Sequence, residues 1–379
     1  MPRLSRANDR QASGGNDMTA QAQQPAAASR TALEERLRRV LAVHFDPSGG
    51  SAYWLERAAA LGIDPLGDVK TMNDLSCFGE MTPADLRPRP LTDYVPRCLH
   101  GRLDEFVVGQ TGGTTGVGVW SAYRFDEFEE AFVSPFVAAA SHVGFPRGVP
   151  WLFVGPSGPH IIAKAARRLA QSMGSPDPFS VDFDSRWAKV LPAGSFAQQR
   201  YLAHLTEQAV QVIAAQDIGV IFATPAVLRP LADAMTATQR ERIRGVHYGG
   251  MALRSDDLKA FQADLFPDAV HLSGYGNTLF GCCLELNVRP GRDLDYFPFG
   301  PRLWLEVVDE DGVALPPGHT GTVRFTRLDE SMLIVRMRER DEATLVPAPA
   351  DAPAGFGLPG VRNPSVPTTQ VAGTAVGLY

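Results

Sequence analysis

Residues 269–281, AVHLSGYGNTLFG, join a short apolar run to a turn in which Tyr275 lies between glycines. A short apolar run that ends in glycine is typical of a buried strand. In a sheet of parallel strands, ligands bind outside the carboxyl ends of the strands, where this turn would lie. There Tyr275 could stack on a base and Thr278 could reach a phosphate. Taken alone, the stretch is equally consistent with an ordinary glycine turn whose tyrosine packs in the hydrophobic core.

Apolar runs and helical patterns alternate from about residue 125 to 275. The strand-like runs include PWLFVG (150–155), IGVIFATP (218–225) and GVHYGG (245–250), with helical patterns between them. This alternation favours an α/β domain with a mainly parallel sheet flanked by helices. From residue 281 to about 345 short strands alternate with turns, and DEDG at 309–312 is typical of a hairpin. A smaller β-rich subdomain is therefore expected there.

The two ends of the chain differ from this middle part. Residues 1–30 are rich in Ala, Gln, Ser and Gly without a periodic apolar face, which predicts a disordered segment. Order is expected from residue 31, where TALE has the pattern of a capping box. The tail, residues 346–379, is dominated by Pro, Gly and Ala, so no second packed domain is expected in it. The predicted folded core is therefore 31–345.

The composition excludes several classes of protein. The chain has 379 residues, 44% of them hydrophobic, and a net charge of −6 with mixed signs, which argues against a nucleic-acid partner. No apolar run is long enough for a membrane span and no secretory signal is visible, so a cytoplasmic protein is expected. The four cysteines include the adjacent Cys282 and Cys283 but no CxxC spacing. His247 and His271 lie in apolar strands and are expected to be satisfied core residues.

A second glycine-rich stretch, VVGQTGGTTGVGVW at residues 107–120, has the composition of a phosphate-binding loop. Its backbone N–H groups and threonine hydroxyls could converge on an anion, and glycine permits close approach. It is not a Walker A loop, because the lysine of that motif is absent. Alone, this stretch fits a plain turn between two strands as well as it fits an anion site.

The order of these and further segments resembles that of the adenylate-forming superfamily of acyl-CoA synthetases, adenylation domains and luciferases, in particular its phenylacetate-CoA ligase branch. The resemblance covers about residues 33–347. It rests on TGGTTG (111–116), the aromatic-glycine turn at 275–278, and four further segments: LGIDPLGDVKTMNDLSCFGEMTPADLR (61–87), FATPAVLRPLAD (222–233), HYGGMAL (247–253) and IVRMRERD (334–341).

The resemblance implies a role for each matching residue. Tyr275 would stack on adenine, the Thr278 hydroxyl would contact phosphate, and Asp341 would accept hydrogen bonds from the two ribose hydroxyls. His160 and Gly274 would lie at the acyl pocket, although His160 fits a capping position on the surface equally well. Thr114 and Thr278 are the catalytic candidates. The remaining residues implied to bind ATP or AMP are Thr111, Gly112, Gly113, Thr115, Gly116, Gly249, Gly250, Met251, Gly276 and Asn277.

The sequence departs from the family pattern where the family places catalytic charge. The phosphate loop has no lysine, and Leu279 stands where the family has a Mg²⁺-binding glutamate, with Glu285 as the candidate substitute. Glu339 and Arg340 replace the Thr-Gly pair before the ribose aspartate. In the family a C-terminal lid domain brings a lysine to the α-phosphate, whereas here no lysine follows residue 259 and the tail stands in its place. Adenylation is therefore expected to be slow unless an arginine compensates, the candidates being Arg336, Arg338 and Arg340.

The preferred interpretation is a protein that uses ATP to activate a carboxylic acid as an acyl-adenylate. The resemblance to the phenylacetate-CoA ligase branch implies that the acid is aromatic. The acyl group would pass to a partner acceptor or reductase in specialised metabolism such as antibiotic biosynthesis, with a homodimer as the candidate assembly. Two alternatives stay open: a non-catalytic module that binds nucleotide or acyl-adenylate, and an acyl-protein synthetase that loads one of its own cysteines.

Overall fold

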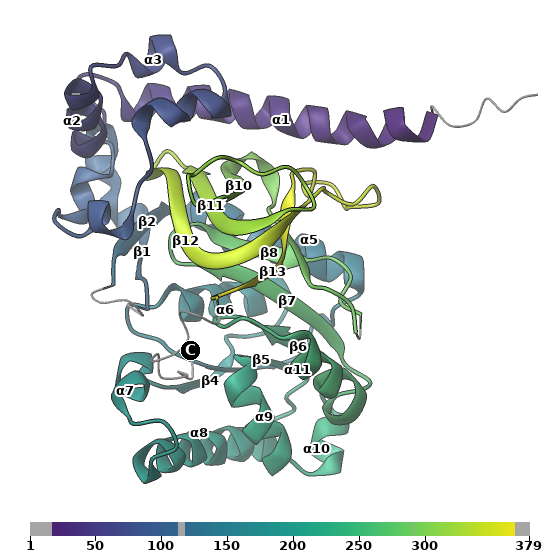
Figure 1. Cartoon of the computed structure of the whole chain (residues 1–379). Coiled ribbons are helices and arrows are strands. Elements are labelled where there is room, and N and C mark those ends of the chain that lie inside the picture. The colour runs from purple at the N-terminus through teal and green to yellow at the C-terminus, as the bar shows by residue number, and fades with distance from the viewer. Residues whose placement is uncertain (1–16, 113–117, 290, 368–379) are drawn as a thin grey trace, which may run out of the picture.

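A mixed sheet of eleven strands runs through the part of the chain that the computed structural model describes, residues 17–112, 118–289 and 291–367 (Figure 1). The strand order is β10-β11-β12-β13-β9-β8-β7-β6-β5-β3-β4. A separate antiparallel pair consists of β1 (Phe106–Gln110) and β2 (Trp120–Arg124). The strands of the large sheet are β3 (Trp151–Gly155), β4 (Phe179–Asp182), β5 (Val220–Ala223), β6 (Gly245–Tyr248), β7 (Val270–Asn277), β8 (Gly281–Glu285), β9 (Asp295–Phe297), β10 (Leu303–Val308), β11 (Thr320–Leu328), β12 (Leu333–Val346) and β13 (Gly360–Ser365).

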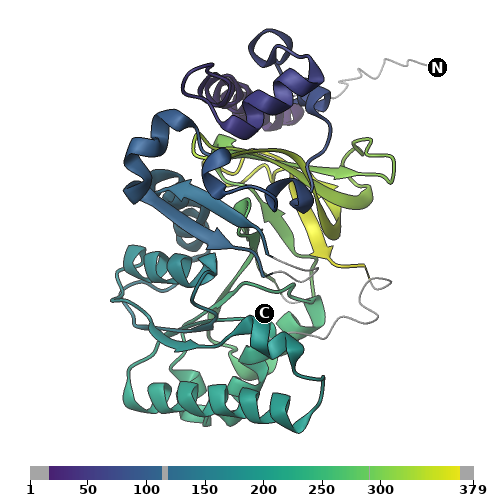
Figure 2. The same ribbon diagram turned by 90° about the vertical axis from the view of Figure 1, so that its left-hand side faces the viewer.

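The helices cover the sheet and connect its strands. Figure 2 shows the same arrangement from the side, with helices packed along the parallel half of the sheet. The α-helices are α1 (Asp17–His44), α2 (Ala52–Leu61), α3 (Pro65–Asp68), α4 (Phe125–Phe128), α5 (Ser134–Val143), α6 (Ile161–Ser172), α7 (Ser185–Val190), α8 (Phe196–Ala215), α9 (Pro225–Ala234), α10 (Ala237–Glu241) and α11 (Ser255–Ala260). Among the described residues, no helix has both the length and the hydropathy that a membrane crossing requires.

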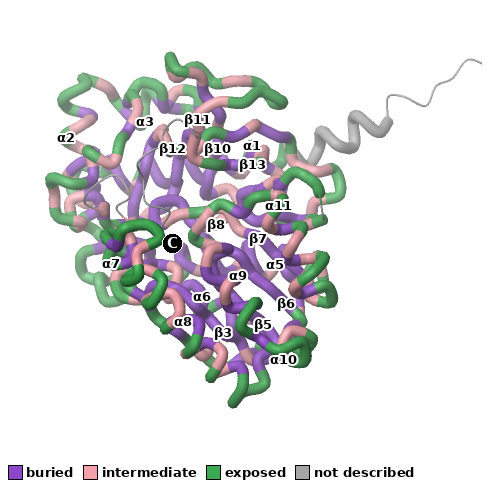
Figure 3. Tube along the Cα trace, turned by 60° about the horizontal axis from the view of Figure 1, so that its bottom comes forward, coloured by how far each residue is buried: buried purple, intermediate pink, exposed green. Residues whose placement is uncertain are grey.

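The parallel half of the sheet, β4-β3-β5-β6-β7, is buried on both faces, as the apolar runs predicted (Figure 3). Successive side chains of β3 pack into two different parts of the hydrophobic core, because side chains alternate between the two faces of a strand. Trp151 and Phe153 pack with α5 and α6, whereas Leu152 and Val154 pack with α8 and α9. The resulting helix–sheet–helix arrangement is the α/β fold that the alternation indicated.

Strand β7 joins the two halves of the sheet. Its residues 270–273 pair in parallel with β6, and its residues 274–277 pair antiparallel with β8. The β-rich part is thus continuous with the parallel part through one strand and is not a separate sheet. The predicted hairpin lies between β10 and β11, where Gly312 has φ +81°, a conformation that glycine adopts without strain.

Both chain ends are more regular than their composition predicted. Helix α1 begins at Asp17, so the prediction of disorder is wrong for residues 17–30, and Thr31 lies inside the helix, where its hydroxyl donates to the Ala27 carbonyl. The reason is that Ala and Gln favour a helix once packed residues further along, such as Leu33 and Leu37, have nucleated it. Residues 1–16 lie outside the described part.

The tail also forms part of the fold. Strand β12 continues to Val346, and β13 is inserted between β12 and β9. Phe356 is fully buried against Phe299, and Arg362 donates two hydrogen bonds to the Asp295 carboxylate. The predicted boundary at residue 345 is therefore wrong, because backbone pairing with β12 and β9 orders a segment that has no periodic apolar pattern. Residues 368–379 are outside the described part.

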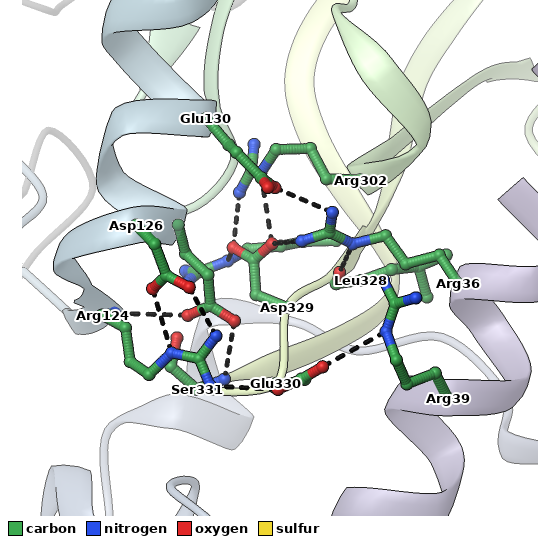
Figure 4. Close-up of polar contacts among 12 residues, drawn as sticks. Arg36, Arg39, Arg124, Asp126, Glu130, Arg302, Leu328, Asp329, Glu330 and Ser331 are labelled. Atoms are coloured by element: carbon green, nitrogen blue, oxygen red, sulfur yellow. Dashed lines mark hydrogen bonds and ion pairs between the residues drawn. The ribbon is translucent and has the colours of Figure 1, made fainter. Parts of the chain in front are cut away.

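A buried ion cluster lies where α1, α4 and the β-rich half meet (Figure 4). The Asp329 carboxylate, which is 0% exposed, accepts hydrogen bonds from Arg36, Arg302 and Arg327. Arg302 also donates to the Phe280 carbonyl, and Arg327 donates to the Leu279 carbonyl. The cluster therefore fixes the backbone that directly follows the turn carrying Tyr275 and Thr278.

Candidate functional site

A cavity of about 70 Å³ lies between helices α5 and α6 and the carboxyl ends of β5, β6 and β7. This is the position where an open α/β sheet binds ligands. Most of its lining is apolar. The lining residues are Phe132, Phe136, Ile161, Ile162, Ala165, Leu169, Phe222, His247, Tyr248, Gly249, Gly250, Gly274, Gly276, Asn277, Thr278, Gly281 and Cys282.

The turn after β7 forms one wall of this cavity. The Asn277 side-chain oxygen accepts hydrogen bonds from the backbone N–H groups of Leu279 and Phe280, at 2.8 and 3.1 Å. The Tyr123 hydroxyl donates to the Thr278 carbonyl at 2.8 Å. Gly276 has to be glycine, because a Cβ there would collide with the Gly281 carbonyl oxygen. The turn is therefore rigid before any ligand binds.

Tyr275 and Asp341 are hydrogen-bonded to each other next to this wall, although neither is among the residues that line the cavity. The Tyr275 hydroxyl donates to Asp341 Oδ2 at 3.0 Å, across 66 positions of sequence. Burial raises the pKa of the Asp341 carboxyl, and burial also raises the pKa of the tyrosine hydroxyl. Glu339 lies beside this pair and accepts a hydrogen bond from Asn277 Nδ2 at 2.5 Å. Burial, and next the charge of Asp341, raise the pKa of Glu339 to about 7.

The glycine-rich loop connects β1 and β2 beside the same wall. The Thr111 backbone N–H donates to the Val119 carbonyl, and the Thr111 hydroxyl accepts from the Val119 N–H at 3.0 Å, which closes the loop at its base. The Thr278 hydroxyl donates to the Gln110 carbonyl at 3.4 Å, so the loop and the turn touch. The predicted loop residues Gly113, Thr114, Thr115 and Gly116 lie outside the described residues.

A lysine that the sequence did not associate with the loop lies against its first glycine. Lys189, on α7, donates from Nζ to the Gly112 carbonyl at 3.2 Å. Burial lowers the pKa of Lys189, and the charge of Arg340 lowers it further, so these two cations are close to each other. Arg338, in contrast, is paired with Glu80 at 2.5 Å, and the same carboxylate lies 4.0 Å from Arg336. Of the three arginine candidates, Arg340 is thus the one beside the loop lysine.

The other predicted site residues have mixed outcomes. Gly249, Gly250 and Gly274 line the cavity, whereas Met251 is not among the lining residues. His160 is 4% exposed and precedes α6, with Nε2 3.1 Å from the Ser185 hydroxyl. It is therefore not on the surface, and it is not among the cavity's lining residues either.

The structure does not support Glu285 as a substitute Mg²⁺ ligand. Glu285 is 5% exposed, and its Oε2 accepts a hydrogen bond from the Asn287 N–H at 2.6 Å. Burial raises the pKa of its carboxyl to about 7. Within the described residues no group of three or more His, Cys, Asp or Glu side chains could hold a metal ion.

Two cavity residues carry chemistry that the sequence analysis did not assign to the site. Cys282 lines the cavity, and burial raises the pKa of its thiol to about 12, so it is a protonated thiol and a poor nucleophile. His247 is buried, as expected of a core histidine, but its ring also lines the cavity. The sequence signal that could have identified these two residues is their position on predicted strands that border the expected pocket.

No family model and no curated protein matches the sequence. Solved structures of acyl-CoA ligases do match the fold. One is 2-hydroxyisobutyryl-CoA ligase in the postadenylation state in complex with R3-HIB-AMP, with a TM-score of 0.65, 15% identity, and coverage of 94% of this chain and 72% of that one. An open conformation of that ligase, in complex with 2-HIB-AMP and CoA, has the same score and identity, with coverage of 94% and 79%. The chain therefore shares the fold of these acyl-CoA ligases.

Proposed function

We propose that the protein activates a carboxylic acid with ATP, forming an enzyme-bound acyl-adenylate. One observation carries the proposal: Tyr275 and Asp341, which are distant in sequence, are hydrogen-bonded to each other at a turn whose glycines line an apolar cavity and whose Thr278 contacts the strand before the glycine-rich loop. An aromatic face and a carboxylate together fit the base and the ribose hydroxyls of a nucleoside. The apolar cavity next to them fits the body of the acid.

In the proposed reaction a carboxylate oxygen of the acid attacks the α-phosphorus of ATP. An acyl–O–P bond forms, the bond to the β-phosphate oxygen breaks, and pyrophosphate leaves. Because negative charge accumulates around phosphorus, preorganised donors and cations lower the barrier. Thr278 supplies a hydroxyl, and Lys189 and Arg340 supply positive charge at the first glycine of the loop. Thr114 is the second catalytic residue that we propose from the motif.

Finer features of the proposal rest on the resemblance. The acid is aromatic, which agrees with a cavity bordered by Phe132, Phe136 and Phe222. The acyl group then passes to a partner acceptor or reductase in a specialised-metabolite pathway in the cytoplasm, and the protein acts as a homodimer. The matched structures of 2-hydroxyisobutyryl-CoA ligase hold an acyl-AMP, and two of them also hold CoA. These ligands are those of that ligase.

A non-catalytic nucleotide-binding module is the second candidate. It is favoured by Leu279, which is 3% exposed and packs in the core, where the resemblance places a metal-binding glutamate. The cysteine-loading alternative is disfavoured, because the Cys282 thiol in the cavity is held in its protonated form.

Mass spectrometry of the product tests the proposal. The purified chain is incubated with ATP, Mg²⁺ and a panel of aryl and alkyl acids, and acyl-AMP is sought. We expect an acyl-AMP with at least one acid, and at least tenfold less with Asp341→Ala. Nucleotide binding without any acyl-AMP would support the non-catalytic module instead.

A further inference from the structure

The ring of His247 is held as one neutral tautomer. His247 is on β6, 3% exposed, and its Nδ1 lies 2.9 Å from the Leu272 carbonyl oxygen on β7. Because a carbonyl oxygen can only accept, Nδ1 carries the proton. Burial lowers the pKa of His247 to about 4, so the ring stays neutral above that pH. The other nitrogen, Nε2, is then a hydrogen-bond acceptor.

Two aromatic rings pack around the imidazole of His247, which lines the cavity. One neighbour is the ring of Phe222, with centroids 4.3 Å apart, and another is Phe136, at 4.8 Å and nearly edge-on. Gly274 lies at the Cε1 edge, where an added Cβ would be 3.5 Å from that carbon. Both residues line the cavity, and because Gly274 has no side chain, that residue leaves the Cε1 edge of the ring, between Nδ1 and Nε2, uncovered.

The other side-chain polar groups of the described lining already have partners. The Asn277 amide bonds Leu279, Phe280 and Glu339, and the Thr278 hydroxyl donates to Gln110. The Tyr248 hydroxyl pairs with His271, and the Cys282 thiol points at the Cys283 carbonyl. Among these described side chains, His247 Nε2 is the one acceptor with no protein partner. Covering this acceptor with a ligand that offers it no donor is costly, so a ligand that supplies a donor gains affinity.

We propose that the acid bound here carries a hydrogen-bond donor, a hydroxyl or an N–H, on its apolar body, and that this donor bonds His247 Nε2. The inference rests on the proposed function, because it takes the cavity to be the acyl site. A pocket that offers an acceptor discriminates strongly against an analogue that lacks the donor, since the acceptor is then left unpaired. His247 is therefore the specificity-determining residue of the pocket.

A matched acid series tests this. Phenylacetate is compared with its 2-, 3- and 4-hydroxy derivatives and with the corresponding methoxy ethers, which keep the oxygen but lose the donor. Acid affinity is measured by calorimetry, and acid-dependent exchange of labelled pyrophosphate into ATP is measured in parallel. We expect at least one hydroxy acid to bind about tenfold or more tightly than both its parent and its ether.

His247→Asn keeps an N–H that can donate to the Leu272 carbonyl, and its shorter side chain has no acceptor at the position of Nε2. We expect the hydroxy preference, measured as the ratio of affinities for the hydroxy acid and its parent, to fall to within about twofold in this variant. His271→Asn is the matched control, because His271 is buried on the neighbouring strand but does not line the cavity, and it should keep the preference.

The outcomes separate the two proposals. A hydroxy preference that depends on His247, without exchange, would overturn the proposed activity and support the inference. Exchange with parent, ether and hydroxy acids at equal efficiency would overturn the inference and leave the activity standing. A preference that persists in His247→Asn would overturn the inference, and failure of every acid to bind would overturn both.

Discussion

Replacing Asp329 with asparagine tests the packing that positions the site. The carboxylate is fully buried and accepts from Arg302 at 2.5 and 3.2 Å, from Arg327 at 2.6 Å and from Arg36 at 3.3 Å. Burial alone would raise the pKa of Asp329, but the charges of Arg302 and Arg327 hold it well below its usual range. Asparagine keeps the volume and removes the charge.

The expected loss of unfolding free energy follows from the arginine charges that stay buried in the variant. Arg302 and Arg327 are 3% and 0% exposed, so the variant leaves positive charge buried without its counter-ion. Breaking a buried ion pair in this way costs about 3–5 kcal/mol of unfolding free energy. The same arginines hold the Leu279 and Phe280 carbonyls, so nucleotide affinity should fall together with stability.

Urea unfolding at pH 7 measures the loss. The control is Asp217→Asn, whose carboxylate is 98% exposed and lies 3.8 Å from Arg242. A surface pair of this kind contributes at most about 1 kcal/mol. If Asp329→Asn destabilised the protein no more than the control does, the assignment of Asp329 as the counter-ion of this cluster would be refuted.

Two further predictions concern the nucleotide side of the site. Asp341→Ala should weaken AMP binding by at least about 1.5 kcal/mol, the scale of a hydrogen bond to a charged group, as measured by calorimetry; an unchanged affinity would contradict the assignment of Asp341 to the ribose. Glu339 has a pKa of about 7, so its carboxyl is neutral at pH 6 and charged at pH 8. Because the charged form adds repulsion next to a bound phosphate, ATP affinity should fall as pH rises from 6 to 8. Glu339→Gln should flatten that pH dependence, and an equally steep dependence in the variant would exclude Glu339 as its source.

Local sequence patterns predicted the parallel strands well, because apolar runs such as WLFVG and VIFA are buried on both faces in β3 and β5. The resemblance assigned Tyr275 and Asp341 to the base and the ribose of one nucleotide, and in the structure the two side chains are hydrogen-bonded to each other. The helical residues 17–30 were missed because they continue a helix whose buried residues begin only at Leu33, and strand β13 was missed because its pairing with β12 and β9 leaves no local apolar pattern.

The charged and polar groups around the site were harder to predict. Lys189 meets Gly112 across 77 positions, and no motif connects the two. The Asp329 cluster likewise joins residues nearly 300 positions apart. His247 was expected to be a satisfied core residue, and the sequence could not show that Gly274, on the next strand, leaves the Cε1 edge of its ring uncovered.

The most direct test of the central claim is carboxylate-dependent exchange of labelled pyrophosphate into ATP by the full chain. Exchange reports the reversible formation of an acyl-adenylate and does not depend on the later acceptor. We predict exchange that requires an acid and falls at least tenfold in Asp341→Ala. Measurable ATP binding without exchange, for every aryl and alkyl acid tested, would contradict the claim that this protein activates carboxylic acids.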